Sequence, residues 1–221
     1  MKAGNLNKIM SLITDARLSS YKETDVDGID VLIQRYLFNI EVCEAFYPIL
    51  SLFEIALRNS ICNSICKVIT KEFLLKEASR RDILTENDHK NLLKTVERLK
   101  NSGMKITNDR LISEMTLGFW IHLCTKNYKT KLWDKKGFFE SVFPNYKPIS
   151  QLKSIGMLQN ELLKVLKLRN RIFHHEIIIN SKISLKDYYN LIRDLLYLMS
   201  NDMVELLDSL NRIEIISRQK P

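Results

Sequence analysis

The chain has 221 residues, of which 45% are hydrophobic, and this composition supports a packed core and excludes global disorder. Only six glycines and four prolines occur, so the sequence favours helices over a β fold with many turns. The formal net charge of +8 favours a polyanionic partner such as nucleic acid, and no stretch reaches the roughly 18 apolar residues that a membrane span needs.

The first predicted elements are helical. Residues 5–19 have the pattern of a short helix, and a break rich in capping residues follows at 24–28. Residues 30–69 are predicted to form one long helical stretch, with Pro48 as the point where it would divide. A set of apolar side chains with helical spacing is expected to line one buried face: Tyr47, Leu50, Phe53, Leu57 and Ile61.

The second half of the chain is also predicted to be helical. Thr85 and Asp88 have the spacing of a helix start, and that helix should end near Gly103. Further helices are expected from 108 toward 128, from 150 to 174 and from 184 to about 215, with a loop at 134–148. Residues 177–179 are the only candidate for a strand. We therefore expect one all-α domain over residues 1–221.

The cysteines and the N-terminus point to an intracellular, metal-free protein. Residues 1–14 have no apolar region or cleavage site typical of a secretory signal, so we expect a cytoplasmic location. Disulfides are rare in that compartment, and the four cysteines are expected to be small buried side chains. Cys62 and Cys66 have no histidine or further cysteine pair at zinc spacing, so no metal or cofactor is predicted.

The most informative segment is LRNRIFHHE at residues 168–176. Arg169 stands where the apolar stripe of the preceding helix requires its next core residue, and arginine is rare there unless it is paired or used. Asn170 and His174 are four residues apart and share a helix face. Arg169 is rotated by somewhat more than a quarter turn from Asn170, and its long side chain can reach the same region.

These residue types suit the cleavage of RNA by its own 2′-hydroxyl. Histidine titrates near neutrality, so His174 can remove a proton from the attacking oxygen or donate one to the leaving oxygen. The guanidinium of Arg169 can bind the phosphate through two hydrogen bonds and stabilise its developing charge. The alternative is structural, because an arginine and a histidine at this spacing also occur by chance, and histidines favour helix C-termini.

Three blocks in this order resemble Abi-like (abortive infection) proteins of the HEPN superfamily. The closing block at residues 169–174 matches Arg-Asn, three variable residues and His. The block at residues 44–59, which ends in EIALRN, is similar to the first core helix of the family, which carries a similar Glu-x-x-x-Arg-Asn. The block SEMTLGFW at 113–120, followed by Leu-Trp at 132–133, is similar to its middle segment. One departure is Ile177, where the family commonly has proline after His-His-Glu.

The resemblance implies properties that composition does not. It implies a HEPN-like helical bundle with peripheral helices, often a homodimer in which two motif copies form one active site. It also implies a metal-independent endoribonuclease of a phage-defence or toxin–antitoxin system, with an antitoxin protein or small RNA as a further partner. On that basis Arg169, Asn170 and His174 are the expected catalytic residues, while Arg171 and His175 are expected to bind RNA.

Two other groups of residues have side chains that suit RNA binding. Glu54 and Arg58 are four residues apart, and an internal ion pair is favoured over a role of Arg58 on RNA or of Glu54 in orienting Arg169. Lysines such as Lys129 and Lys131 lie among Tyr128 and Trp133, which permits phosphate binding and base stacking. A solvated lysine face with Trp133 in the core is slightly favoured over that site.

Three hypotheses for function remain open at this point. The first is an endoribonuclease that depends on His174. The second is a non-catalytic RNA-binding or regulatory HEPN module, in which the same residues hold RNA without cutting it. The third is a helical interaction protein whose motif is only a polar dimer seam. Cleavage, binding without cleavage, and dimerisation without RNA affinity would distinguish them.

Overall fold

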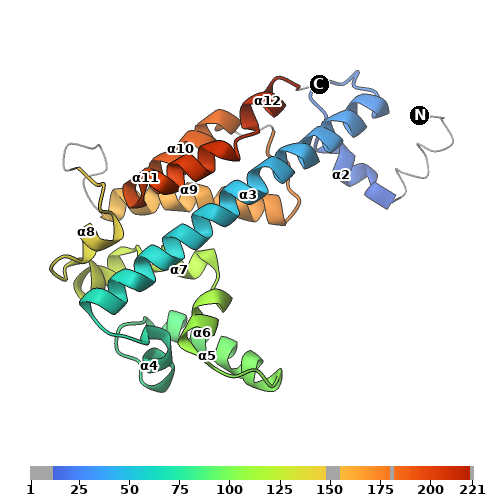
Figure 1. Cartoon of the computed structure of the whole chain (residues 1–221). Coiled ribbons are helices and arrows are strands. Elements are labelled where there is room, and N and C mark those ends of the chain that lie inside the picture. The colour runs from blue at the N-terminus through green and yellow to red at the C-terminus, as the bar shows by residue number, and fades with distance from the viewer. Residues whose placement is uncertain (1–11, 148–154, 180–181, 220–221) are drawn as a thin grey trace.

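The computed structural model describes residues 12–147, 155–179 and 182–219, and these residues form helices and no strand. The predicted all-α class is therefore confirmed (Figure 1). The helices, with a 3-10 turn η1 and a π turn η2, have these bounds: α2 (Asp15–Ser19), α3 (Ile29–Val68), α4 (Phe73–Ser79), α5 (Glu86–Asn101), α6 (Asn108–Glu114), α7 (Leu117–Leu123), η1 (Lys126–Tyr128), η2 (Lys129–Trp133), α8 (Phe138–Val142), α9 (Ile155–Phe173), α10 (Leu185–Met199), α11 (Asn201–Ser209) and α12 (Ile213–Ser217).

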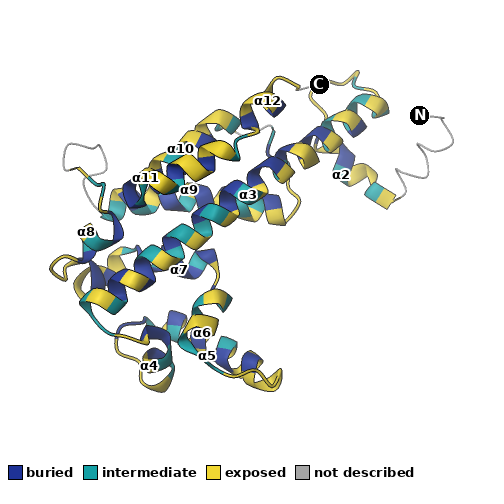
Figure 2. Cartoon of the chain, in the orientation of Figure 1, coloured by how far each residue is buried: buried dark blue, intermediate teal, exposed yellow. Residues whose placement is uncertain are grey.

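Helix α3 is the spine of the molecule. It has 40 residues, which corresponds to about 60 Å of helix, and it continues through Pro48 without a break. The single helical stretch predicted over 30–69 is therefore confirmed, and Pro48 does not divide it. Buried and exposed residues alternate along the whole helix (Figure 2). Four residues of the expected apolar face are buried, whereas Tyr47 is 58% exposed because it lies at the surface beside Phe173.

The other helices pack on α3 in two groups. Helix α10 contacts α11 and α12, all three contact α3, and α9 contacts both α10 and α7. Helices α4, α5 and α6 pack together near the C-terminal end of α3, away from α12 (Figure 1). Each helix therefore buries an apolar stripe against α3 or against a neighbour that contacts it.

Single capping residues divide two of the predicted helices. The helix expected from 108 toward 128 is split into α6 and α7, because Thr116 is extended and its hydroxyl accepts from the Phe119 N–H at 3.4 Å. The last predicted helix is split at Ser200, whose hydroxyl accepts from the Met203 N–H at 3.4 Å. Helix α8 lies within the expected loop at 134–148.

The remaining expectations are met in part. Helix α2 covers only the end of the helix expected at 5–19, and Thr14 interrupts it with a φ of 71°. Residues 5–11 and 150–154 lie outside the described residues, so α9 is first seen at Ile155. Residues 177–179 form no strand. Among the described helices none is both long and apolar enough to cross a membrane.

Candidate functional site

The LRNRIFHHE segment forms the C-terminal end of α9. The Glu176 N–H donates to the Arg171 carbonyl at 2.8 Å, and the His175 N–H donates to the Ile172 carbonyl at 3.1 Å. This pair of bonds is a Schellman motif, in which the residue after the cap is left-handed. His175 takes that position with a φ of 57°. The helix therefore ends in a defined turn that displays His174 and His175 on the surface.

Long-range hydrogen bonds hold the chain that follows α9. The buried amide of Asn39 on α3 donates to the Glu176 carbonyl at 3.3 Å and accepts from the Ile178 N–H at 2.8 Å. The Arg171 guanidinium donates to the Ile177 carbonyl and lies 3.7 Å from the Glu176 carboxylate. Arg171, expected to bind RNA, is thus engaged within the protein and helps to fix the exit of α9.

Arg169 lies in a small pocket between α9 and α3. The pocket has a volume of about 130 Å³, and its lining includes Tyr47, Glu54, Arg58 and Phe173. The guanidinium stacks on the Phe173 ring with its carbon 4.2 Å from the ring centre, and one terminal nitrogen donates to the Asn170 side chain at 3.4 Å. The buried Nε of Arg169 has no hydrogen-bond partner among the described residues.

Glu54 and Arg58 line the same pocket but do not form the internal ion pair that was favoured from the sequence. The ion pairs between described residues include none of Glu54, Arg58 or Arg169. Arg58 donates only to its neighbour Asn59, at 3.4 Å. The pocket thus holds two guanidinium groups without a carboxylate within ion-pairing distance, which is an arrangement suited to an anion such as a phosphate.

His174 does not join Arg169 within one copy of the chain. The two residues are five positions apart, which is a rotation of about 140° around the helix axis. His174 is exposed, lies outside the lining of the Arg169 pocket, and its ring makes no hydrogen bond to a described residue. Of the three expected catalytic residues, the structure therefore brings together Arg169 and Asn170 only.

The lysine-rich segment has no exposed aromatic ring for base stacking. Tyr128 and Trp133 are buried, and the indole N–H of Trp133 donates to the Leu123 carbonyl at 2.7 Å. Lys129 forms a 2.7 Å ion pair with Asp134. Lys131 donates to the Asp82 carbonyl at 2.6 Å. The favoured interpretation, a solvated lysine face over buried aromatics, agrees with this geometry.

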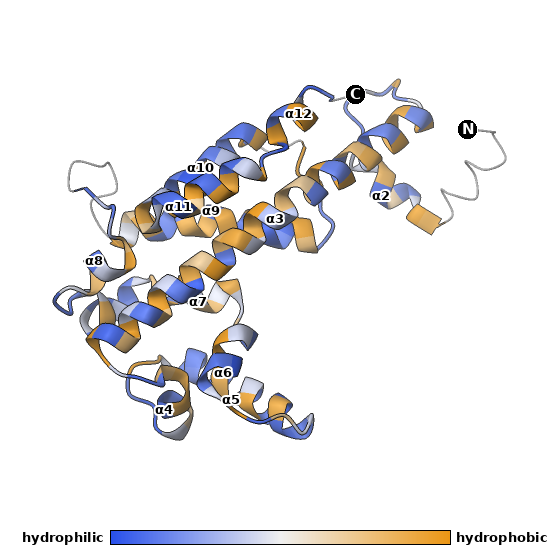
Figure 3. Cartoon of the chain, viewed as in Figure 1, coloured by the Kyte–Doolittle hydropathy of each residue, from blue (hydrophilic) through white to orange (hydrophobic). Residues whose placement is uncertain are grey.

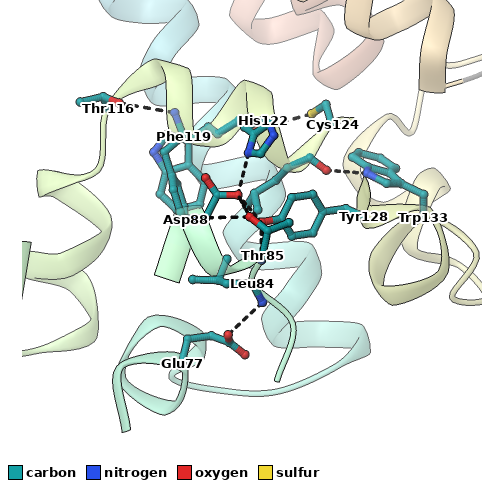
Figure 4. Close-up of polar contacts among 12 residues, drawn as sticks. Glu77, Leu84, Thr85, Asp88, Thr116, Phe119, His122, Cys124, Tyr128 and Trp133 are labelled. Atoms are coloured by element: carbon teal, nitrogen blue, oxygen red, sulfur yellow. Dashed lines mark hydrogen bonds and ion pairs between the residues drawn. The ribbon is translucent and has the colours of Figure 1, made fainter. Parts of the chain in front are cut away.

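A second polar cluster, which sequence reasoning missed, lies where α5 meets α7 (Figure 4). One carboxylate oxygen of Asp88 accepts from the Thr85 hydroxyl at 2.8 Å, lies 2.6 Å from Nδ1 of His122, and accepts from the Tyr128 hydroxyl. Asp88 is only 4% exposed. Burial, with the bond to Asp88, raises the pKa of Tyr128. The sequence does not reveal this cluster, because His122 has no partner near it in the chain and Asp88, at the third position of α5, has only the pattern of a helix start.

The cysteines and carboxylates offer no second kind of chemistry. The four cysteines are free, and burial raises the pKa of Cys43 to about 11 and that of Cys62 to about 12, so both remain thiols near neutral pH. Within the described ranges, no three histidine, cysteine, aspartate or glutamate side chains gather as metal ligands would. Comparison with protein-family models, curated proteins and solved structures finds no match to this chain.

Proposed function

We propose that this chain is a HEPN-like, metal-independent endoribonuclease of the abortive-infection or toxin type. In this proposal Arg169 binds the scissile phosphate, His174 transfers a proton, and Asn170 positions Arg169. The observation that carries the proposal is the state of Arg169, which is half-buried, stacked on Phe173 and without a carboxylate partner among the described residues. A buried charge is costly unless it is used, and RNA would supply the missing anion.

A homodimer would bring a histidine close to the Arg169 pocket. His174 and Arg169 diverge on one helix, so the partner copy must bring its own His174 to the Arg169 pocket. Apolar side chains that border this pocket favour such contact, since Tyr47, Ile55 and Phe173 are 58%, 43% and 44% exposed. Hydrophobic residues recur along the length of α3 (Figure 3).

The test is cleavage of total cellular RNA in the presence of EDTA. We expect wild-type protein to release fragments that end in cyclic phosphate, and His174→Ala to lower the rate by about 10²- to 10⁴-fold. Arg110→Ala is a matched control for the loss of one cationic side chain, because Arg110 is exposed on α6. Intact RNA with every variant, or cleavage that EDTA abolishes, would contradict the proposal.

The second candidate is a non-catalytic RNA-binding module, and the separation of Arg169 from His174 within one copy favours it. RNA binding that Arg169→Ala weakens, without cleavage by the wild type, would select this function. An antitoxin protein or small RNA that covers the Arg169 pocket fits either proposal. A dimer without any RNA affinity would leave only the third hypothesis, a polar dimer seam.

A further inference from the structure

A second cleft lies between α5, α7 and α9. Its volume is about 650 Å³, which is within the range of pockets that hold small organic ligands. It shares no lining residue with the pocket of Arg169. Two members of the cluster in Figure 4, Asp88 and His122, line this cleft. The cleft is thus a separate candidate site.

The cluster holds the imidazole of His122 in one orientation. Asp88 is fixed by the Thr85 hydroxyl, and the Tyr128 hydroxyl is inserted between the Asp88 carboxylate and the Thr85 N–H, from which it accepts at 3.0 Å. Nδ1 of His122 lies 2.6 Å from the Asp88 carboxylate, which favours the neutral tautomer with its proton on Nδ1 and leaves Nε2 as the acceptor for a ligand. Nε2 makes no hydrogen bond to the described part of the chain, and 37% of the side chain is exposed.

The chemistry of the wall limits the class of ligand. No lysine or arginine is among the described residues that line the cleft, so nothing there would balance a phosphate. Asp88 and Glu114 add negative charge, although Glu114 is paired with Arg98 at 2.6 Å. An anionic ligand is therefore disfavoured in comparison with an uncharged one.

The remaining lining suits a flat polar ring. The carboxamides of Asn87, Asn91 and Gln159 each present a donor and an acceptor. Apolar side chains, including those of Leu163 and Leu166, provide a surface for the faces of a ring. Amide side chains that pair with the edge of a heterocycle, together with an apolar surface for its face, are the features with which proteins recognise an unpaired nucleobase.

We propose that this cleft binds an uncharged nucleobase, with Nε2 of His122 accepting a hydrogen bond from its edge and Gln159 contacting the same edge. Nucleobase binding here does not depend on the proposed nuclease activity of Arg169 and His174. The base has two possible sources, a free nucleoside or an unpaired position in an RNA strand. Both present the same edge to the cleft, and the experiment separates them.

The experiment is a calorimetric titration of the full chain with adenosine, guanosine, cytidine and uridine. We expect one of them to bind, and His122→Asn and Gln159→Leu each to weaken it by about three- to tenfold, the effect of one lost hydrogen bond. His122→Asn leaves an amide N–H for Asp88 while it removes Nε2, and therefore keeps the cluster satisfied. Gln34→Leu, on the exposed surface of α3, is the matched control for Gln159→Leu.

Each outcome bears on the proposal. If an RNA tetramer binds far more tightly than the best nucleoside and both cleft variants weaken it, the source is a strand. If nucleoside and tetramer bind equally well, the source is a free nucleoside. No nucleoside binding at millimolar concentration, binding by both variants as tight as that of the wild type, or competition by ribose 5-phosphate would overturn the proposal. Thermal melting of each variant verifies that it is folded, and cleavage by the nuclease pocket is measured separately.

Discussion

The pocket of Arg169 and the cluster of Asp88 differ in whether their charged groups have partners within the protein. At the pocket, two arginines and a glutamate lie together without an ion pair, and a buried guanidinium nitrogen has no partner among the described residues. In the cluster, a buried carboxylate has three polar partners within hydrogen-bond distance. An unpaired buried charge costs stability, whereas a satisfied network does not. Substitutions in the Arg169 pocket are therefore expected to leave the stability of the fold unchanged, and substitutions in the Asp88 cluster are expected to lower it.

The largest expected effect tests whether the Arg169 pocket is completed by a second copy. Arg169→Ala and His174→Ala are each expected to be inactive, yet an equal mixture should recover about a quarter of wild-type cleavage. Half of the dimers are mixed, and one of their two sites combines intact Arg169 with intact His174. The recovered rate is measured after the subunits have exchanged. No recovery would place both residues in one copy, against the present geometry.

The next effect tests the dependence of the fold on the Asp88 cluster. Asp88→Ala leaves the buried Tyr128 hydroxyl and the His122 ring without their acceptor, and we expect the free energy of unfolding to fall by about 3 kcal/mol. The melting temperature should fall by about 6–12 °C. Asp25→Ala is the control, because its side chain is fully exposed. A melting temperature equal to that of the control would show that the cluster does not stabilise the fold.

A smaller effect is expected at the exit of α9, which the buried amide of Asn39 holds. Asn39→Ala removes the hydrogen bonds to the Glu176 carbonyl and from the Ile178 N–H and leaves that buried N–H unpaired, so we expect a loss of about 2 kcal/mol in the free energy of unfolding. Urea denaturation measures this value. Asn63→Ala on the exposed side of α3 serves as its control. An unchanged midpoint would mean that Asn39 is not needed to hold the segment.

The smallest expected effect is an increase in the free energy of unfolding. His175 is left-handed with a φ of 57°, a conformation that glycine adopts without the penalty of a Cβ atom. His175→Gly should therefore raise the free energy of unfolding by about 0.5–1 kcal/mol, again measured with urea. His174→Gly, one residue earlier, should not raise it. Destabilisation by His175→Gly would indicate that the His175 ring contributes more to the fold than its backbone costs.

The sequence predicts those helices whose signals are local and long. The expected limits of 30 and 69 differ by one residue at each end from those of α3, Ile29–Val68, and the capping threonine of α5 is correctly placed. The breaks at Thr116 and Ser200 were missed, because one hydroxyl that caps a helix outweighs a continuous helical period there. Periodicity placed Tyr47 on the buried face, but it does not tell where the covering helices end.

The α9 motif could be predicted from the sequence, whereas the cleft between α5, α7 and α9 could not. The residues of the α9 motif are neighbours in the chain, so their spacing shows that a charged group interrupts an apolar stripe. The cleft combines residues of α5, α7 and α9 that only the tertiary fold brings together, and His122 has no partner near it in sequence. The pairing of Glu54 with Arg58 failed as well, because both side chains turn toward the Arg169 pocket.

The hydrogen bonds of Asn39 also set an order of events during synthesis. They join residues 137 and 139 positions apart, and the pocket needs α3 together with the end of α9. A chain still on the ribosome carries a finished α3 long before Ile178 has emerged, and it therefore has no completed arginine pocket. For a protein proposed to cut RNA, that delay means that its own messenger meets no formed site before the codons of α9 have been translated.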